Sequence, residues 1–203
     1  MDTPDGIYYA LLIGNRDYQH LPPLETPFSD IEQIGTLLQE RYGFEVTFLR
    51  NTTRAQIYAA LFDFGRRMGP NDSFLLYYAR HVLVVADSCF SGSIARGQSD
   101  GKQCIAVSRQ RLAARKSRNV LASGSLEPVV DGQGGGLSAF ARAFLATLGD
   151  SHDDFSMGEA FPEIQEMVAR NSDQTPVYSY IRNTGDELRD FVFRPTIDEP
   201  ATR

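Results

Sequence analysis

The chain has 203 residues, of which 42% are hydrophobic, and this composition is sufficient for one domain with a substantial core. Its formal net charge of -6 and its pI near 5.1 disfavour nucleic acids and anionic membranes as partners. No apolar run approaches the roughly 20 residues of a membrane span, and the first residues lack the basic and apolar regions of a signal peptide. We therefore expect a cytoplasmic protein.

The few cysteines and histidines do not form a metal-binding pattern. Besides Cys89 and Cys104, the chain has only His20, His81 and His152, and their spacing does not match a zinc site. A cytosolic chain of this size needs no disulfide bond. No acidic cluster has EF-hand spacing, although a calcium site built from scattered carboxylates remains an alternative. We expect no cofactor and no structural metal.

The N-terminal part of the chain alternates between strand and helix patterns. Apolar runs predict three strands, and apolar residues at helical spacing predict a helix after each of the first two strands. This order predicts a parallel sheet with helices on both faces. The expected strands are Tyr8–Gly14, Glu45–Leu49 and Phe74–Ala79. Ser29 or Asp30 would cap the first helix, which ends near Tyr42 and Gly43. Thr52 or Thr53 would cap the second helix.

A fourth apolar run, Val82 to Ala86, predicts a buried strand, and a polar turn containing Cys89 follows it. A free cysteine is often a small core residue. Here the turn-forming neighbours favour a thiol that is accessible at the end of a strand, where open α/β sheets bind their ligands. Cys89 is therefore a candidate functional residue.

The segment Asp87-Ser88-Cys89-Phe90-Ser91-Gly92 resembles the catalytic cysteine motif of the metacaspase branch of the caspase-like cysteine peptidases. The resemblance runs from about Tyr8 to Phe193. It implies a single caspase-like domain over residues 1–203 with the caspase-hemoglobinase fold, an α/β architecture with a mainly parallel central sheet flanked by helices on both faces.

The rest of the chain fits this resemblance. Residues 93–118 are polar and rich in basic residues, which predicts a solvated loop and, by the resemblance, a loop for self-cleavage. A glycine-rich loop at 131–136 lacks the ending of a phosphate-binding loop. The further expected elements are a strand at Asn119–Ala122, helices at Ser138–Leu148 and Met157–Ala169, an edge strand from Thr175 to Tyr178 and a short strand from Asp190 to Phe193.

The resemblance also implies the chemistry. Cys89 would attack the scissile carbonyl, a histidine would take the thiol proton, and water would hydrolyse the acyl-enzyme. The metacaspase branch cuts after Arg or Lys with two acidic pocket residues, which correspond to Asp30 and Asp87. The alternatives are that Asp30 is only a helix cap and Asp87 only a turn residue.

The histidine of the family is absent from its expected place. The family has Tyr-Tyr-Ala-Gly-His-Gly at the end of the third strand, whereas this chain continues from Ala79 into Arg80, His81 and Val82. His81 would lie roughly 25 Å from Cys89 along an extended strand, too far to act as its base. His20, in the loop after the first strand, is the only backup base.

The same place raises a problem of topology. Two parallel strands need a crossover of about a dozen residues or more, but Ala79 to Val82 leaves room only for a tight turn. Either the two strands are antiparallel, or the sequence omits an internal stretch between residues 79 and 80 that carries the catalytic His-Gly. We favour the second hypothesis.

Two functions remain open. The first is a cysteine endopeptidase that cuts after Arg or Lys, with protein or peptide substrates that contain basic residues and a regulatory protein as partners. The second is an inactive caspase-like binding or scaffold module that lacks the catalytic histidine. The intact Asp87-Ser88-Cys89 favours the peptidase.

Overall fold

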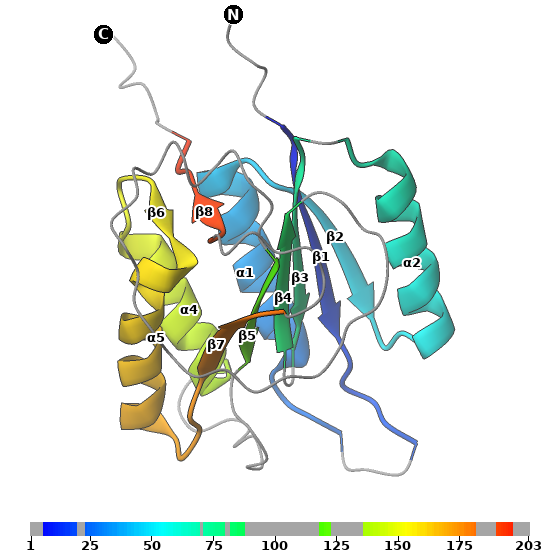
Figure 1. The fold of residues 1–203 in the computed structure, drawn as a ribbon. Helices are drawn as coiled ribbons and strands as arrows, with labels where there is room; N and C mark the ends of the chain where they lie inside the picture. Colours follow the sequence, from blue (N-terminus) through cyan, green and yellow to red (C-terminus); the bar gives the residue numbers. More distant parts are fainter. Residues whose placement is uncertain are drawn as a thin grey trace, which may run out of the picture.

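The computed structural model describes residues 6–19, 23–69, 71–79, 82–87, 118–122, 136–181 and 190–196. None of the helices in these segments is long and apolar enough to cross a membrane. Figure 1 shows a central sheet between helices. The helices and strands of the fold are, in chain order, β1 Tyr8–Gly14, α1 Pro27–Tyr42, β2 Glu45–Arg50, α2 Arg54–Arg67, β3 Ser73–Tyr78, β4 Val82–Asp87, β5 Arg118–Ala122, α4 Ala139–Asp150, β6 Phe155–Ser156, α5 Met157–Asn171, β7 Val177–Tyr180 and β8 Val192–Phe193.

The predicted elements are present, with small shifts at their ends. The main sheet has the order β2-β1-β3-β4-β5-β7. β1 lies between β2 and β3 and is parallel to both. The alternating order of strands and helices predicted this parallel arrangement. β7 is an edge strand, also as predicted. The last short strand, β8, is not part of this sheet and pairs only with β6.

The expectation of a mainly parallel sheet is wrong for this chain. β4 is antiparallel to β3, β5 is antiparallel to β4, and β7 is antiparallel to β5. The cause is the connection after β3, which ends at Tyr78, because only residues 79–81 separate it from Val82. Three residues can join antiparallel neighbours but cannot form the crossover that a parallel pair needs.

The helix ends follow local sequence rules, with one correction. Thr53 caps α2 and forms a reciprocal capping box with Gln56, as predicted. The first helix, α1, starts earlier than expected: Pro27 begins it, and Asp30 lies inside its first turn rather than at its cap. Pro is favoured at this position because its missing N–H has no partner in a first turn anyway.

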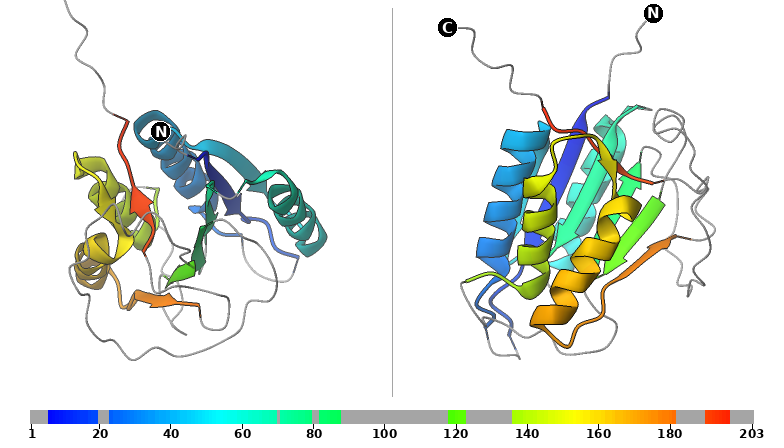
Figure 2. Two further views of the ribbon diagram at one scale, coloured as in Figure 1. Left: turned by 45° about the horizontal axis from the view of Figure 1, so that its top comes forward. Right: turned by 90° about the vertical axis from the view of Figure 1, so that its left-hand side faces the viewer.

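Alternate residues of β1 bury their side chains in two different clusters. Ala10 and Leu12 pack on the side of α1, α4 and α5, whereas Leu11 and Ile13 pack on the side of α2. This alternation is the two-residue period of a strand that is buried on both faces. In Figure 2, α1, α4 and α5 lie side by side across one face, and α2 lies on the other.

A buried polar cluster fastens β5, β7 and the start of α5 to the segment before β8. The Asp190 carboxylate accepts hydrogen bonds from the Gly158 N–H (2.7 Å), from Asn119 Nδ2 (3.1 Å) and from the Tyr178 hydroxyl. Burial raises the pKa of Asp190 above its usual value, although the hydrogen bonds from Tyr178 and Gly158 oppose the rise. Burial, together with the Asp190 charge, also raises the pKa of Tyr178 well above its usual value.

We expect Phe144→Ala to lower the free energy of unfolding by about 3–5 kcal/mol, because the ring is fully buried between Tyr77, Phe140 and Phe193. Phe62→Ala is the matched control. Its ring is 66% exposed on α2, so we expect a change within about 0.5 kcal/mol. Urea denaturation followed by circular dichroism measures both, and equal losses would contradict this assignment of the core.

The Asp190 cluster predicts a pH dependence. The pKa of Asp190 in the folded state lies above 3.8, the ordinary value for an aspartate. The protonated carboxyl therefore adds to the free energy of unfolding. This contribution is fully present below pH 3.8 and is lost as the pH rises through the folded-state pKa. Asp190→Asn cannot titrate. The difference in unfolding free energy between the native protein and this variant should therefore fall as the pH rises, and a difference that stays constant would refute the raised pKa.

Candidate active site

The parallel strands β1, β2 and β3 end at one edge of the sheet, and polar side chains tie these ends together. Asn15, directly after β1, donates from Nδ2 to the Thr52 carbonyl and to the Tyr78 hydroxyl, both at 3.2 Å. Its Oδ1 accepts from the Thr52 N–H at 2.9 Å. One asparagine thus holds the ends of three strands, at the edge where open α/β sheets place their ligand sites.

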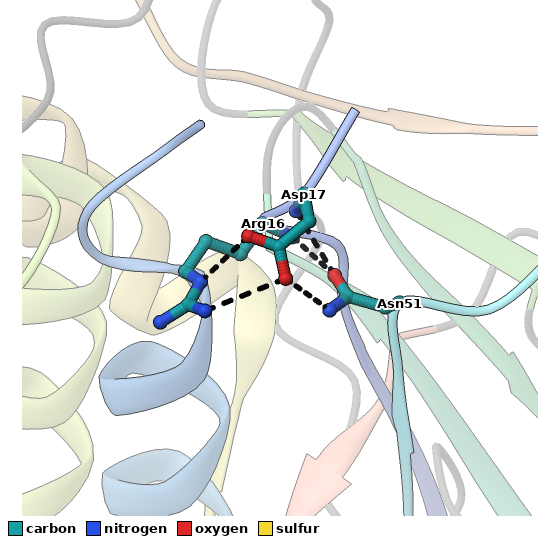
Figure 3. Close-up of polar contacts among 3 residues, drawn as sticks. All are labelled: Arg16, Asp17 and Asn51. Atoms are coloured by element: carbon teal, nitrogen blue, oxygen red, sulfur yellow. Dashed lines mark hydrogen bonds and ion pairs between the residues drawn. The ribbon is translucent and has the colours of Figure 1, made fainter. Parts of the chain in front are cut away.

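A second asparagine fixes the loop after β1. Asn51 has a φ of 47°, in the left-handed region that asparagine tolerates better than most residues. Its Oδ1 accepts from the N–H groups of Arg16 (2.9 Å) and Asp17 (3.0 Å), and its Nδ2 donates to the Asp17 carboxylate at 2.6 Å, as Figure 3 shows. The hydrogen bonds from Arg16 and then from Asn51 lower the pKa of Asp17.

The predicted pocket residue Asp30 is a buried carboxylate near this edge. The residue is only 2% exposed, and its Oδ1 accepts a hydrogen bond from the backbone N–H of Ser138 at 2.9 Å. Ser138 is the N-cap of α4, so this bond joins the start of α1 to the start of α4. Asp30 lies three residues after Pro27 in α1, and Pro27 contacts the last residue of β1. A Cβ added to Gly14 would lie only 2.8 Å from the Pro27 carbonyl oxygen, so Asp30 is near the strand ends.

Tyr77 of β3 lies in the same buried cluster. Burial raises the pKa of its hydroxyl well above the usual value, the charge of Asp30 adds to the rise, and a hydrogen bond with Ser138 opposes it. The hydroxyl therefore stays protonated over the range in which proteins are ordinarily studied. Asp30, Tyr77 and Ser138 bring α1, β3 and α4 together.

The second predicted pocket residue, Asp87, is at the other end of the sheet in this chain. Asp87 pairs in register with Ser73, the first residue of β3, and Ser73 pairs with Tyr8, the first residue of β1. Six extended residues span roughly 17 Å from Val82 to Asp87. The structure therefore does not bring Asp30 and Asp87 together, because β4 runs antiparallel to β3.

Several residues discussed from the sequence lie outside the described residues: the predicted nucleophile Cys89, the backup base His20, His81, Cys104 and nearly all of the predicted self-cleavage loop at 93–118. The strand that leads to Cys89 ends, with Asp87, where β1 and β3 begin. β5 ends at Ala122, which pairs with Val82 at the opposite edge. β4 and β5 therefore end at opposite edges of the sheet.

Sequence reasoning missed the two asparagines and Tyr77. A usable signal was present, since Asn15 follows directly after one predicted strand and Asn51 lies two residues after the next, where a polar side chain can bond neighbouring backbone groups. Tyr77 gave no such signal because it belongs to an apolar run. Within the segments that the structure describes, no group of three or more His, Cys, Asp or Glu side chains is placed to hold a metal ion.

We expect Asp30→Ala to lower the free energy of unfolding by about 1–3 kcal/mol, because it removes the acceptor of the buried Ser138 N–H. Asp30→Asn keeps an oxygen there and should cost less. Glu32→Ala is the control on the same helix, since its surface ion pair with Arg50 should contribute less than about 1 kcal/mol. Urea denaturation compares the three variants, and a loss in Asp30→Ala no larger than in Glu32→Ala would contradict a structural role for the carboxylate.

Two comparisons with known proteins bear on the identity of this site. A search of curated proteins gave no match. Residues 7–96 match the family model described as Caspase domain. This stretch begins just before β1, includes Asp30, Asp87 and Cys89, and covers fewer than half of the 203 residues. The N-terminal part of this chain is thus similar to the caspase domain, which supports a relation to the caspase-like cysteine peptidases.

Proposed function

We propose that this domain is a cysteine endopeptidase of the caspase-like type that cuts after Arg or Lys. The observation that carries the proposal is the Caspase domain match, which includes the segment Asp87-Ser88-Cys89 after an apolar strand. In the proposed reaction the Cys89 thiolate attacks the scissile carbonyl carbon and forms a thioester. The amine leaves with a proton from the histidine, and water then releases the acid and restores the thiol.

The proposed specificity rests on two carboxylates. Asp30 is buried near the edge where β1 and β3 end, and a guanidinium brought out of water there would keep charge-assisted hydrogen bonds. An apolar or acidic side chain could not make such bonds and would be rejected. Asp87 would supply the second carboxylate of the pocket if β4 ended at the same edge.

The proposed active form differs from this chain in the direction of β4. We propose that the active form carries a His-Gly segment between Ala79 and Arg80, in a crossover that lets β4 run parallel to β3. Asp87 and Cys89 would then leave the sheet near Asp30. The segment from 88 to 117, which joins β4 to β5, is long enough for either direction of β4.

A second candidate function is a caspase-like binding or scaffold module without peptidase activity. The short connection between β3 and β4 favours it, because a hairpin there places Asp87 and Asp30 at opposite ends of the sheet. The chain then has no base for Cys89 at the place where the family has one.

A peptidase assay separates the two functions. We expect the 203-residue chain to release no fluorophore from a peptide that ends in Arg beyond the rate of its Cys89→Ser variant. A variant with a His-Gly crossover from a caspase-like peptidase inserted after Ala79 should cleave this peptide. Asp87→Ala in that background should lower kcat/KM by ~30-fold or more, because a buried guanidinium loses one carboxylate partner.

The controls decide what a negative result means. Cys89→Ala in the insertion variant should abolish cleavage, and circular dichroism should show that all variants are folded. A folded insertion variant without activity would overturn the peptidase proposal and leave the scaffold module. An intact mass of 22.6 kDa for the protein from its native source would mean that it has no further segment, whereas a mass several kDa higher would agree with one.

A further inference from the structure

The helix α2 has apolar side chains on two opposite faces. Its inner face packs against β1 and β3 through Phe64 and the partly buried Ile57 and Leu61. Its outer face carries Ala55, Tyr58, Ala59 and Phe62, all exposed, and we call these four residues the α2 outer stripe. In Figure 1 α2 lies at the side of the molecule, away from α1, α4 and α5.

The outer stripe has the spacing of a helix-packing surface. Its residues stand at positions i, i+3, i+4 and i+7, which form one continuous face of an α-helix. Tyr58 is 56% exposed and Phe62 is 66% exposed. The two residues are four positions apart, which is about one helical turn. An exposed face with this period is expected on a helix that packs against another helix, whereas a solvated face is normally polar.

Arginines flank the stripe at both ends. Arg54 donates to the Tyr58 hydroxyl at 3.0 Å, and its guanidinium carbon lies 5.2 Å from the Tyr58 ring centre. The Arg66 guanidinium carbon lies 5.9 Å from the Phe62 ring centre. Neither arginine has a carboxylate partner among the residues that the structure describes.

The charge of α2 differs in sign from that of the whole chain. The helix carries Arg54, Arg66 and Arg67 against a single acidic residue, Asp63, while the chain has a net charge of -6. A partner that covers the stripe must therefore offer apolar side chains in the middle and negative charge at both ends, because desolvated arginines need charge-assisted bonds.

We propose that the α2 outer stripe is a docking surface for an acidic amphipathic helix of a partner protein. Apolar side chains of this helix, at positions i, i+3, i+4 and i+7, pack between Tyr58 and Phe62. Its Glu or Asp side chains pair with Arg54 and Arg66. The proposal does not depend on peptidase activity, since α2 covers the face of β1 and β3 opposite to α1 and Asp30.

The test uses a designed peptide of about 18 residues, enough to cover the roughly 21 Å length of α2. It carries Leu at the four stripe positions and Glu at the flanking positions, and a second peptide carries Lys in place of Glu. Fluorescence anisotropy with the full chain should show binding of the Glu peptide that weakens with salt, and no binding of the Lys peptide.

Substitutions in the protein separate the apolar and the charged parts of the surface. Phe62→Ser should weaken binding of the Glu peptide at least ~10-fold, because aromatic residues are often the anchors that contribute most to a helix-packing interface. Val177→Ser, at a residue 43% exposed on the edge strand β7, is the matched control and should leave binding unchanged. The double variant Arg54→Glu with Arg66→Glu should bind the Lys peptide and lose the Glu peptide.

Three results would overturn the proposal. The first is equal binding of both peptides, and the second is unchanged binding in Phe62→Ser. The third is a dimer of the native chain in sedimentation that Phe62→Ser dissociates, because the surface would then serve a second copy of this chain. Circular dichroism of Phe62→Ser excludes loss of the fold as the cause.

Discussion

The length of the connection between β3 and β4 is the constraint on which the second half of the sheet depends. Only residues 79–81 separate the two strands. A connection this short allows a hairpin and excludes a crossover, so β4 runs antiparallel to β3. β5 and β7 pair with the strand before them and also run antiparallel to it. The direction of one strand thus fixes the edge at which each later strand ends.

The first half of the sheet does not depend on this connection. β1, β2 and β3 are parallel neighbours whose ends are joined by Asn15 and Asn51. Asp30 lies beside them, buried and bonded to Ser138. This half contains the start of the stretch that matches the caspase domain, and it contains Asp30, one of the two carboxylates of the proposed pocket for Arg or Lys. A change in the direction of β4 would bring the other.

The two sides of the molecule suggest two separate roles. The side of α1, α4 and α5 holds the larger core, with Phe144 and Phe193 at its centre, and Asp30 at its margin. The side of α2 holds a small core and presents the α2 outer stripe to solvent. A partner on α2 would bind on the face of the sheet opposite to α1 and Asp30, so binding and any catalysis would use different faces.

The sequence by itself determined the elements and their local ends. The apolar run of β1, the helical spacing in α1 and the Thr53 cap of α2 are local patterns, and local hydrogen bonding and burial decide them. The resemblance predicted Asp30 as a site residue, which stays a prediction, whereas its burial is a finding of the structure. Only the tertiary structure decided which strand ends meet, because strand direction depends on pairing between distant segments. For the same reason it placed Asp87 opposite Ser73 and joined Asp190 to Asn119, contacts for which no local pattern exists.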